Sequence, residues 1–275
     1  MSWQGQAIWI TGASSGIGAA LARGLAAQGA RLVLSGRNRA ALEAVAKDCG
    51  ETLVLPFEVT DYAALPALAD QAWDWAGGLD GLINNAGISQ RSLAVDTAFA
   101  VYQQIVDVDL LAPIALTQTL LPRMAARGKG RIVMVSSLAG KFGAPLRTAY
   151  SAAKFGLIGY ADALRAEVAG LGLAVQVIAP GAVQSNVSRN ALTADGTRRG
   201  ASDSTIDNGI DTTEAAAEML AELARGEREI IIARGMELQL GEARRTPDAL
   251  FDQIAAMVAA GYAQQMAAEA EEAGA

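Results

Sequence analysis

The stretch that decides the fold of this chain reads Thr11-Gly12-Ala13-Ser14-Ser15-Gly16-Ile17-Gly18. It follows the apolar run Ala7–Ile10 and opens a helical pattern that continues to residue 28. A strand, a glycine-rich turn and a helix N-terminus in this order can cradle a diphosphate, because free backbone amides point at it. Gly12 permits the tight turn, Gly16 lets the phosphates approach the backbone, and Gly18 allows close packing of helix on strand. Taken alone, the spacing G-x-x-x-G-x-G is also compatible with an ordinary loop.

Strand-like and helical patterns alternate along most of the chain. Apolar strand-like runs lie near 6–10, 31–35, 52–55, 80–84, 131–136, 173–179 and 229–233. Helical patterns lie near 17–28, 39–48, 61–76, 97–125, 148–169 and 212–225. This alternation predicts an α/β fold in which a doubly wound parallel sheet of about seven strands has helices on both faces.

Two further segments lie outside the alternation. Residues 182–211 are rich in Ser, Asn, Thr, Asp and Gly, and a loop of this length directly after a strand end is typical of a lid. Residues 247–270 place Leu250, Ile254 and Val258 at a spacing that predicts an amphipathic helix. We therefore predict a catalytic domain at 1–234, followed by a helical extension at 235–275 that packs on the same domain or on a partner subunit.

Composition narrows the possible chemistry. The 275 residues include no histidine and one cysteine, Cys49. This excludes a Ser-His-Asp triad, a Cys-His dyad, a histidine-ligated metal and an intramolecular disulfide, so we expect no metal site. Acid–base work must then fall to Tyr, Lys, Asp or Glu. The net charge of -7 argues against a nucleic-acid partner.

No targeting or membrane segment is visible in the sequence. Residues 1–10 combine neither a positive region nor a long apolar stretch. Together with the lone cysteine, this predicts a soluble protein of the reducing cytoplasm that has no membrane partner.

The side chains best suited to proton transfer are Tyr150 and Lys154, with Ser137 upstream. Tyr and Lys four residues apart share one face of a helix. A phenol beside an ammonium can exchange a proton near neutral pH, and a nearby hydroxyl can hold a carbonyl oxygen. These groups suit proton transfer at a ketone or an alcohol if a nicotinamide supplies the hydride.

Five short motifs in this order and spacing resemble the short-chain dehydrogenase/reductase family over roughly residues 5–234. They are Thr11–Gly18, Asn84–Gly87, Ser137, Tyr150-x-x-x-Lys154 and Pro180-Gly181. Two stretches, 109–122 and 185–200, are similar to the member 7/7B type of dehydrogenase/reductase proteins. The resemblance implies a single-domain Rossmann fold and an oxidoreductase that interconverts a small carbonyl compound and its alcohol. It also implies a homodimer or homotetramer that assembles through the helices near 97–125 and 148–169.

The resemblance also implies roles for the candidate catalytic residues. Tyr150 would be the general acid and base, Lys154 would favour release of its proton and hold the nicotinamide ribose, and Ser137 would orient the substrate oxygen. Moving a tyrosine from ~10 to about 7 takes roughly 4 kcal/mol. A unit charge at ~4 Å and an effective dielectric near 20 supplies about 4 kcal/mol, so Lys154 is sufficient. Ser136 is a competing serine that more readily serves to end the strand.

Cofactor contacts follow from the same resemblance. They would come from Gly12, Ser14, Ser15, Gly16, Ile17, Gly18, Arg37, Glu58, Val59, Asn85, Ala86, Gly87, Tyr150, Lys154, Pro180, Gly181, Val183 and Ser185. At the end of the second strand, Gly36 occupies the place where NAD sites carry an acidic residue, and Arg37 follows it. A guanidinium can hold a 2′-phosphate in a bidentate way, so we predict NADP(H) rather than NAD.

Two positions depart from the family pattern. Glu58-Val59 stands where Asp-Val is common, and Asp109 stands where an asparagine usually completes the catalytic set. In the family, the main-chain carbonyl at the position of Asp109 holds a water of the proton relay, which any residue type can do. An added carboxylate would nevertheless oppose ionisation of the tyrosine, unless it caps or bonds within the helix.

Three functions therefore stay open at the level of sequence. The first is an active NADP(H)-dependent oxidoreductase acting on CH–OH groups. The second, motivated by Asp109 and the C-terminal segment, is a nucleotide-binding regulatory or interaction protein with impaired catalysis. The third is an epimerase or dehydratase that uses its cofactor transiently, which the apparent lack of an extended substrate domain disfavours.

Overall fold

The first strand forms the centre of the sheet because its side chains are buried on both faces. In the computed structural model, which describes residues 2–262, Ile8, Trp9 and Ile10 are almost fully buried. Successive residues of a strand point to opposite faces, so an unbroken apolar run requires a layer of helices on each side.

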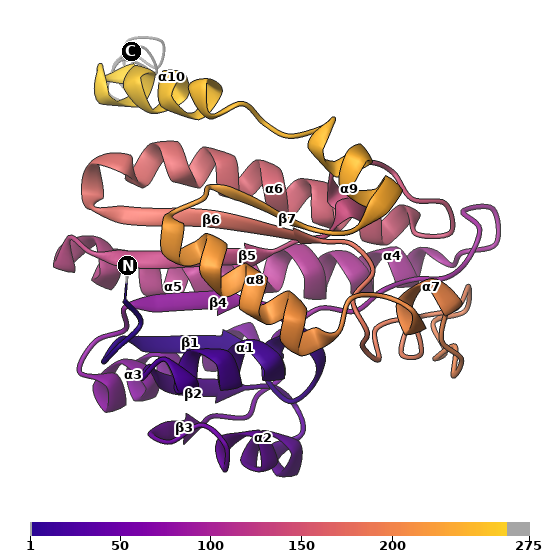
Figure 1. The fold of residues 1–275 in the computed structure, drawn as a ribbon, viewed down its shortest axis with the longest axis horizontal. Coiled ribbons are helices and arrows are strands. Elements are labelled where there is room, and N and C mark those ends of the chain that lie inside the picture. The colour runs from indigo at the N-terminus through magenta and orange to yellow at the C-terminus, as the bar shows by residue number, and fades with distance from the viewer. Residues whose placement is uncertain (1, 263–275) are drawn as a thin grey trace.

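All seven strands are parallel and pair in the order β3-β2-β1-β4-β5-β6-β7 (Figure 1). Their bounds are β1 Ala7–Thr11, β2 Arg31–Ser35, β3 Thr52–Val54, β4 Gly81–Asn84, β5 Gly130–Val135, β6 Leu173–Pro180 and β7 Glu229–Ile232. Each lies within two residues of its predicted position. The doubly wound parallel sheet that the sequence predicts is confirmed.

Most helices fall between the strands as expected, and the last two follow the final strand, β7. They are α1 Gly16–Ala27, α2 Arg39–Ala46, α3 Leu65–Ala76, α4 Phe99–Val106, α5 Ala112–Arg127, α6 Thr148–Val168, α7 Ser204–Asp207, α8 Thr212–Arg225, α9 Gly235–Glu242 and α10 Asp248–Ala259. The predicted helix at 97–125 differs in one respect, because a π-helical turn, Asp107–Leu111, separates α4 from α5. Pro113 has no amide with which to donate an α-helical hydrogen bond to the carbonyl of Asp109, which favours a wider turn at this point.

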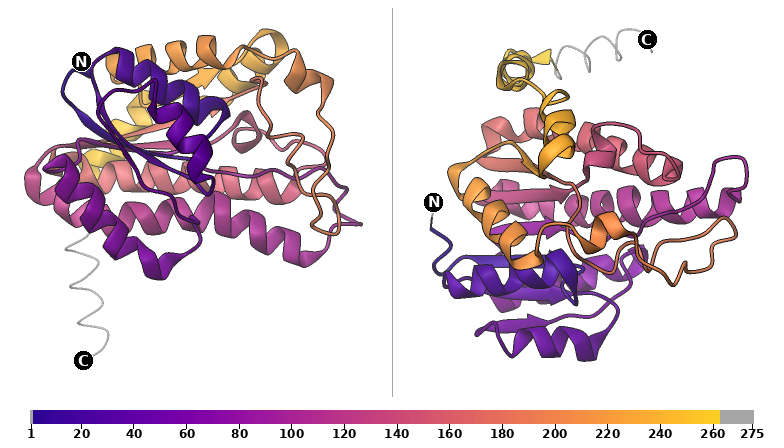
Figure 2. Two further views of the ribbon diagram at one scale, coloured as in Figure 1. Left: turned by 90° about the horizontal axis from the view of Figure 1, so that it is seen from below. Right: turned by 45° about the vertical axis from the view of Figure 1, so that its right-hand side comes forward.

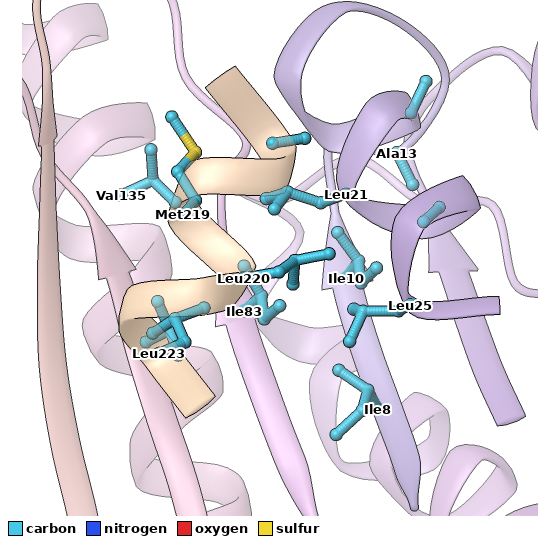
Figure 3. Close-up of a cluster of buried hydrophobic side chains, with 14 of the residues drawn as sticks. Ile8, Ile10, Ala13, Leu21, Leu25, Ile83, Val135, Met219, Leu220 and Leu223 are labelled. Atoms are coloured by element: carbon cyan, nitrogen blue, oxygen red, sulfur yellow. The ribbon is translucent and has the colours of Figure 1, made fainter. Parts of the chain in front are cut away.

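Alternate side chains of the strands belong to two separate hydrophobic cores, one on each face of the sheet. One core joins Ile8 and Ile10 of β1 to Leu21 and Leu25 of α1 and to Leu220 of α8, as Figure 3 shows. The other joins Ala7 and Trp9 to apolar residues of α3, α5 and α6. Burial of these apolar side chains on both faces fixes the sheet between its two helical layers.

The strand order reverses between β1 and β4, which neighbour each other in the sheet although β2 and β3 intervene in the chain. In open α/β sheets, ligands bind beyond the carboxyl ends of the strands at this kind of reversal. The glycine-rich loop after β1 and the loop that begins at Asn85 after β4 both lie there. The topology therefore brings together the motifs that the sequence singled out.

The segment after β7 folds back against the rest of the domain. Helix α9 contacts β7, and α10 lies alongside α6 (Figure 1). Phe251 of α10 is buried. The guanidinium carbon of Arg165 lies 4.2 Å from the centroid of the Phe251 ring, in a cation–π contact. The predicted amphipathic helix is thus present over 248–259, and residues 263–270 of that prediction lie outside the described residues.

The long loop at 182–211 is ordered by contacts to a loop distant in sequence. Both views of Figure 2 show this orange loop at the same end of the molecule as the loop before α4. Arg91 donates to Asp203 at 2.8 Å, and the backbone of Leu192 bonds with Ser89 and Arg91. These contacts anchor the loop to residues 89–91.

The helical stretch Phe99–Arg127 is long and apolar enough, by length and composition, to cross a bilayer. In the fold it packs on α3 and α6, and 39% of its most apolar window is buried. Leu111 and Phe99 remain exposed on it. Apolar side chains at such positions also suit contact with another protein chain.

Candidate active site

A cleft of about 460 Å³ opens at the carboxyl edge of the sheet. Nearly all the predicted site residues line it; Gly18 is the exception, one turn inside α1. The cleft therefore joins the predicted nucleotide loop and the predicted catalytic residues in one continuous space. Among residues 2–262, no cluster of His, Cys, Asp or Glu is suited to hold a metal ion.

The glycine-rich loop needs glycine for reasons of space and conformation. Gly12 and Gly16 have φ angles of 66° and 54°, which side chains disfavour. A Cβ on Gly12 would lie 2.8 Å from the Cα of Ala86, and one on Gly18 would lie 2.3 Å from the carbonyl oxygen of Gly12. The loop after β4 and the first turn of α1 thus close tightly on this turn, and the amides at the start of α1 face the cleft as a diphosphate site requires.

The side chain of Asn85 forms hydrogen bonds to the backbone of this loop. Its Nδ2 donates to the carbonyl oxygens of Thr11 and Gly12, at 3.0 and 3.3 Å. The hydroxyl of Thr11 accepts in turn from the amides of Asn85 and Ala86. The side chain of Asn85 therefore ties β4 to β1, and its predicted contact with the cofactor stays a prediction.

The rim beyond β2 carries the residue predicted to select the cofactor. Arg37 lines the cleft next to Gly36, and its side chain is 65% exposed. Its Nη1 lies 3.5 Å from Oε2 of Glu58, which is 43% exposed. An exposed pair at this distance is weak, so the guanidinium stays available to an incoming phosphate.

Tyr150 and Lys154 lie one turn apart on α6 and both line the cleft. The Nζ of Lys154 is 5.6 Å from the centroid of the Tyr150 ring. It also donates to the carbonyl of Val135 at 3.1 Å. The ammonium is therefore fixed beneath the phenol, as the sequence spacing predicts.

The two serines after β5 have different surroundings. Ser137 caps the short 3-10 helix Leu138–Gly140, accepting from the amide of Ala139 at 3.1 Å, and lines the cleft. Ser136 is buried and donates to the main-chain carbonyl of Lys154 at 2.9 Å. Ser136 thus fastens β5 to α6, and Ser137 is the serine more open to a substrate.

Asp109 forms the contact least expected from sequence. Its Oδ2 lies 3.3 Å from Nζ of Lys154, and its Oδ1 accepts from the amide of Ile88 at 2.8 Å. A Cβ on Gly87 would meet both charged groups at 3.3–3.4 Å, so the backbone at Gly87 covers the pair. The carboxylate bonds outside its own helix, in contrast to the predicted alternative of a local cap.

Burial and charge oppose each other in this pair. Burial raises the pKa of the Asp109 carboxyl, although the charge of Lys154 and the amide of Ile88 act against it. Burial alone would lower the pKa of Lys154, but the charges of Asp109 and Tyr150 outweigh it and raise that pKa. Lys154 therefore remains an ammonium over the neutral range.

The loop after β6 is held by a residue that the sequence did not single out. Oε2 of Glu237, from α9, accepts from the amide of Ala182 at 2.9 Å. A Cβ on Gly181 would lie 2.4 Å from the same oxygen. Ser185, further along this loop, packs against the glycine-rich turn at Gly16. The C-terminal segment thus supports the loop that carries the predicted cofactor contacts Gly181, Val183 and Ser185.

Several polar residues that line the cleft were also not predicted. They are Gln104, Asp107, Asn186, Asn190 and Arg198. Three of them belong to the 182–211 loop, whose polar composition and position after a strand end were the available signals.

Comparison with known proteins agrees with this geometry. The family model of the short chain dehydrogenases matches residues 6–196. The dehydrogenase/reductase SDR family member 7B of Danio rerio is 37% identical over 240 residues, covering 84% of this chain and 78% of that protein. The chain belongs to the short-chain dehydrogenase/reductase family. The resemblance that the motifs carry is confirmed.

Further relatives of this short-chain dehydrogenase/reductase show the same similarity in sequence or in fold. Member 7 of Homo sapiens is 36% identical over 249 residues, covering 84% of this chain and 74% of that protein. A short-chain dehydrogenase from Streptomyces avermitilis superposes with a TM-score of 0.77 at 26% identity, covering 94% of this chain and 99% of that one. A family member from Burkholderia phymatum, solved in complex with NAD, has a TM-score of 0.78 at 21% identity, covering 90% and 98%. That last likeness supports the fold.

Proposed function

We propose that this oxidoreductase interconverts a ketone or aldehyde and the corresponding alcohol, with NADP(H) as its cofactor. One observation carries the proposal: Ser137, Tyr150 and Lys154 line the same cleft as the glycine-rich loop. Proton-transfer groups and a diphosphate cradle in one space are what a carbonyl reduction requires.

The chain's own residues fit the cofactor. Gly12, Gly16 and the start of α1 would hold the diphosphate, because a side chain on Gly12 would collide with Ala86 and Asn85 and disturb the turn that shapes the cradle. Lys154 would hold the nicotinamide ribose, and Arg37 the 2′-phosphate. When bound, the nicotinamide would supply or accept the hydride.

The protein's part of the reaction is proton transfer and orientation. In reduction, the phenol of Tyr150 would donate its proton to the carbonyl oxygen, and in oxidation the phenolate would remove the alcohol proton. The Lys154 ammonium stabilises the phenolate electrostatically. The Ser137 hydroxyl would donate a hydrogen bond to the same oxygen and keep it within reach of Tyr150.

The first test replaces the proton donor. Tyr150→Phe should lower kcat for NADPH-dependent ketone reduction by about 10²- to 10⁴-fold, because the general acid is lost while the ring is kept. The matched control is Tyr160→Phe on the same helix, whose hydroxyl contacts Gln118 and does not line the cleft. Turnover of Tyr150→Phe equal to wild type, on a ketone that wild type reduces, would refute the proposal.

The second candidate is a nucleotide-binding regulator with impaired catalysis. The buried Asp109–Lys154 pair favours it, because the carboxylate offsets the positive charge that activates Tyr150. NADPH fluorescence measures binding, and NADPH oxidation against a panel of ketones and aldehydes measures turnover. Binding without turnover of any panel member would support the regulator.

Cofactor preference depends on Arg37, whose guanidinium suits a 2′-phosphate; the alternative is NAD, as in the Burkholderia phymatum complex. Arg37→Asp should lower the ratio of kcat/KM for NADPH to that for NADH by about 10- to 100-fold, the range of one charged hydrogen bond. Arg39→Asp is the control, since Arg39 is exposed nearby, pairs with Glu43 and does not line the cleft. An unchanged ratio in Arg37→Asp would remove the basis for NADP(H).

We also propose a homo-oligomer that assembles through α5 and α6. Leu111 and Phe155 lie exposed at the start of α5 and on α6, and exposed apolar side chains there suit burial against a second copy. The substrate would be a small carbonyl compound or alcohol rather than a macromolecule.

A further inference from the structure

A short hairpin in the 182–211 loop presents an arginine to the cleft. Leu192 and Arg198 pair as antiparallel bridge partners, and the amide of Thr193 donates to the carbonyl of Thr197 at 2.9 Å. Asp195 holds the turn, accepting from the Thr193 hydroxyl at 2.6 Å. The backbone at Arg198 is therefore fixed, although the segment has little regular structure.

The hairpin lies on the Tyr150 side of the cleft. The amide of Leu192 donates to the carbonyl of Ser89 at 2.7 Å. Its side chain is buried in a cluster with Ala149 and Ala153 of α6, against which Tyr150 packs. Arg198, directly opposite Leu192 in register, therefore belongs to the part of the loop that packs against the Tyr150 side of α6.

The arginines that neighbour Arg198 are engaged with a carboxylate, and none of them lines the cleft. Arg91, Arg147 and Arg199 all lie within 4 Å of one carboxylate, Asp203, so their charges are only partly neutralised. Arg199 points to Asp203, and Arg198, its neighbour in an extended segment, lines the cleft. Within residues 2–262, Arg198 forms no ion pair with an acidic side chain.

We propose that Arg198 binds an anionic group of the substrate, a carboxylate or a phosphate, while Tyr150 and Ser137 hold its carbonyl. This inference rests on the proposed function of the cleft. A guanidinium forms bidentate bonds with both kinds of anion, and Asn186 and Asn190 on the same wall offer further amide donors.

The test compares matched ligands on the NADP⁺-loaded protein by calorimetry and in turnover. The ligands are a keto acid, its methyl ester and a phosphate-bearing ketone of similar length. Arg198→Ala should weaken binding of the two anions and raise their KM by about 10- to 100-fold, with the ester little affected. The control is Arg189→Ala, an exposed arginine of the same loop outside the cleft, which should change neither.

The outcomes separate this inference from the proposed function. Equal losses for the ester and the anions would overturn the role of Arg198, as would a loss confined to NADPH affinity, which would place Arg198 on the cofactor. If wild type binds the anions through Arg198 but reduces neither the anions nor the ester, the anion site stands and the oxidoreductase proposal fails. If wild type reduces the ester and binds the anions no more tightly than the ester, the oxidoreductase proposal stands and the inferred role of Arg198 fails.

Discussion

Among residues 2–262, two lysine–carboxylate pairs are buried, and they differ in geometry and in position. Lys141 and Glu229 lie 2.7 Å apart, with side chains 6% and 3% exposed. Lys154 and Asp109 lie 3.3 Å apart, at 5% and 0%. The first pair connects the end of the 3-10 helix after Ser137 to the start of β7, and neither residue lines the cleft. Both residues of the second pair line it.

The difference shows how two chemically similar ion pairs can have different roles in one protein. Lys141 is bound closely to one carboxylate oxygen, which suits a fixed structural link. Lys154 divides its contacts among Asp109, the carbonyl of Val135 and the ring of Tyr150. Its looser carboxylate contact leaves the ammonium able to act on a phenolate and a ribose. We therefore assign the Lys141–Glu229 pair to stability and, under the proposed function, the Lys154–Asp109 pair to proton transfer.

The largest expected effect comes from removing one partner of the structural pair. Lys141→Met leaves the Glu229 carboxylate buried without its counter-charge, which should lower the free energy of unfolding by about 3–5 kcal/mol. Urea unfolding followed by circular dichroism measures this. The pH dependence of the remaining activity should match wild type.

The control for Lys141→Met is a double variant that removes both charges of the pair. Lys141→Met combined with Glu229→Leu should recover most of the lost stability, because replacing a buried pair with apolar side chains is often neutral or better. A loss below about 1 kcal/mol in Lys141→Met, the range of exposed pairs, would contradict a structural role for the pair.

The sequence predicts the sheet well because the signals for strands and helices are local. Unbroken apolar runs such as Ala7–Ile10 and the glycines at 12, 16 and 18 depend on near neighbours, and both predictions agree with the structure. The placement of Tyr150 and Lys154 on one face of α6 was also predictable, since the two residues share a helix turn, and their catalytic roles stay a prediction.

Contacts between distant segments were not predictable in the same way. Arg91 and Asp203 are 112 residues apart, and Glu237 reaches Ala182 from a helix beyond the last strand. Asp109 could be recognised as a departure from its family, but its salt bridge depends on how α6 packs on the π-helical turn. No local pattern specifies which carboxylate meets which lysine in the folded chain.

The most direct test of the contrast between the two pairs is the pH–rate profile of alcohol oxidation in two matched variants, Asp109→Asn and Glu229→Gln. Each exchanges a carboxylate for an amide of nearly the same shape. In wild type, the Asp109 charge opposes formation of the Tyr150 phenolate, so its removal should favour the phenolate at lower pH. We predict that the rise of kcat with pH moves to lower pH by about one unit in Asp109→Asn, equivalent to ~1.4 kcal/mol, and does not move in Glu229→Gln. Coincident profiles for wild type and Asp109→Asn, or an equal shift in both variants, would contradict the assignment of the Lys154–Asp109 pair to proton transfer.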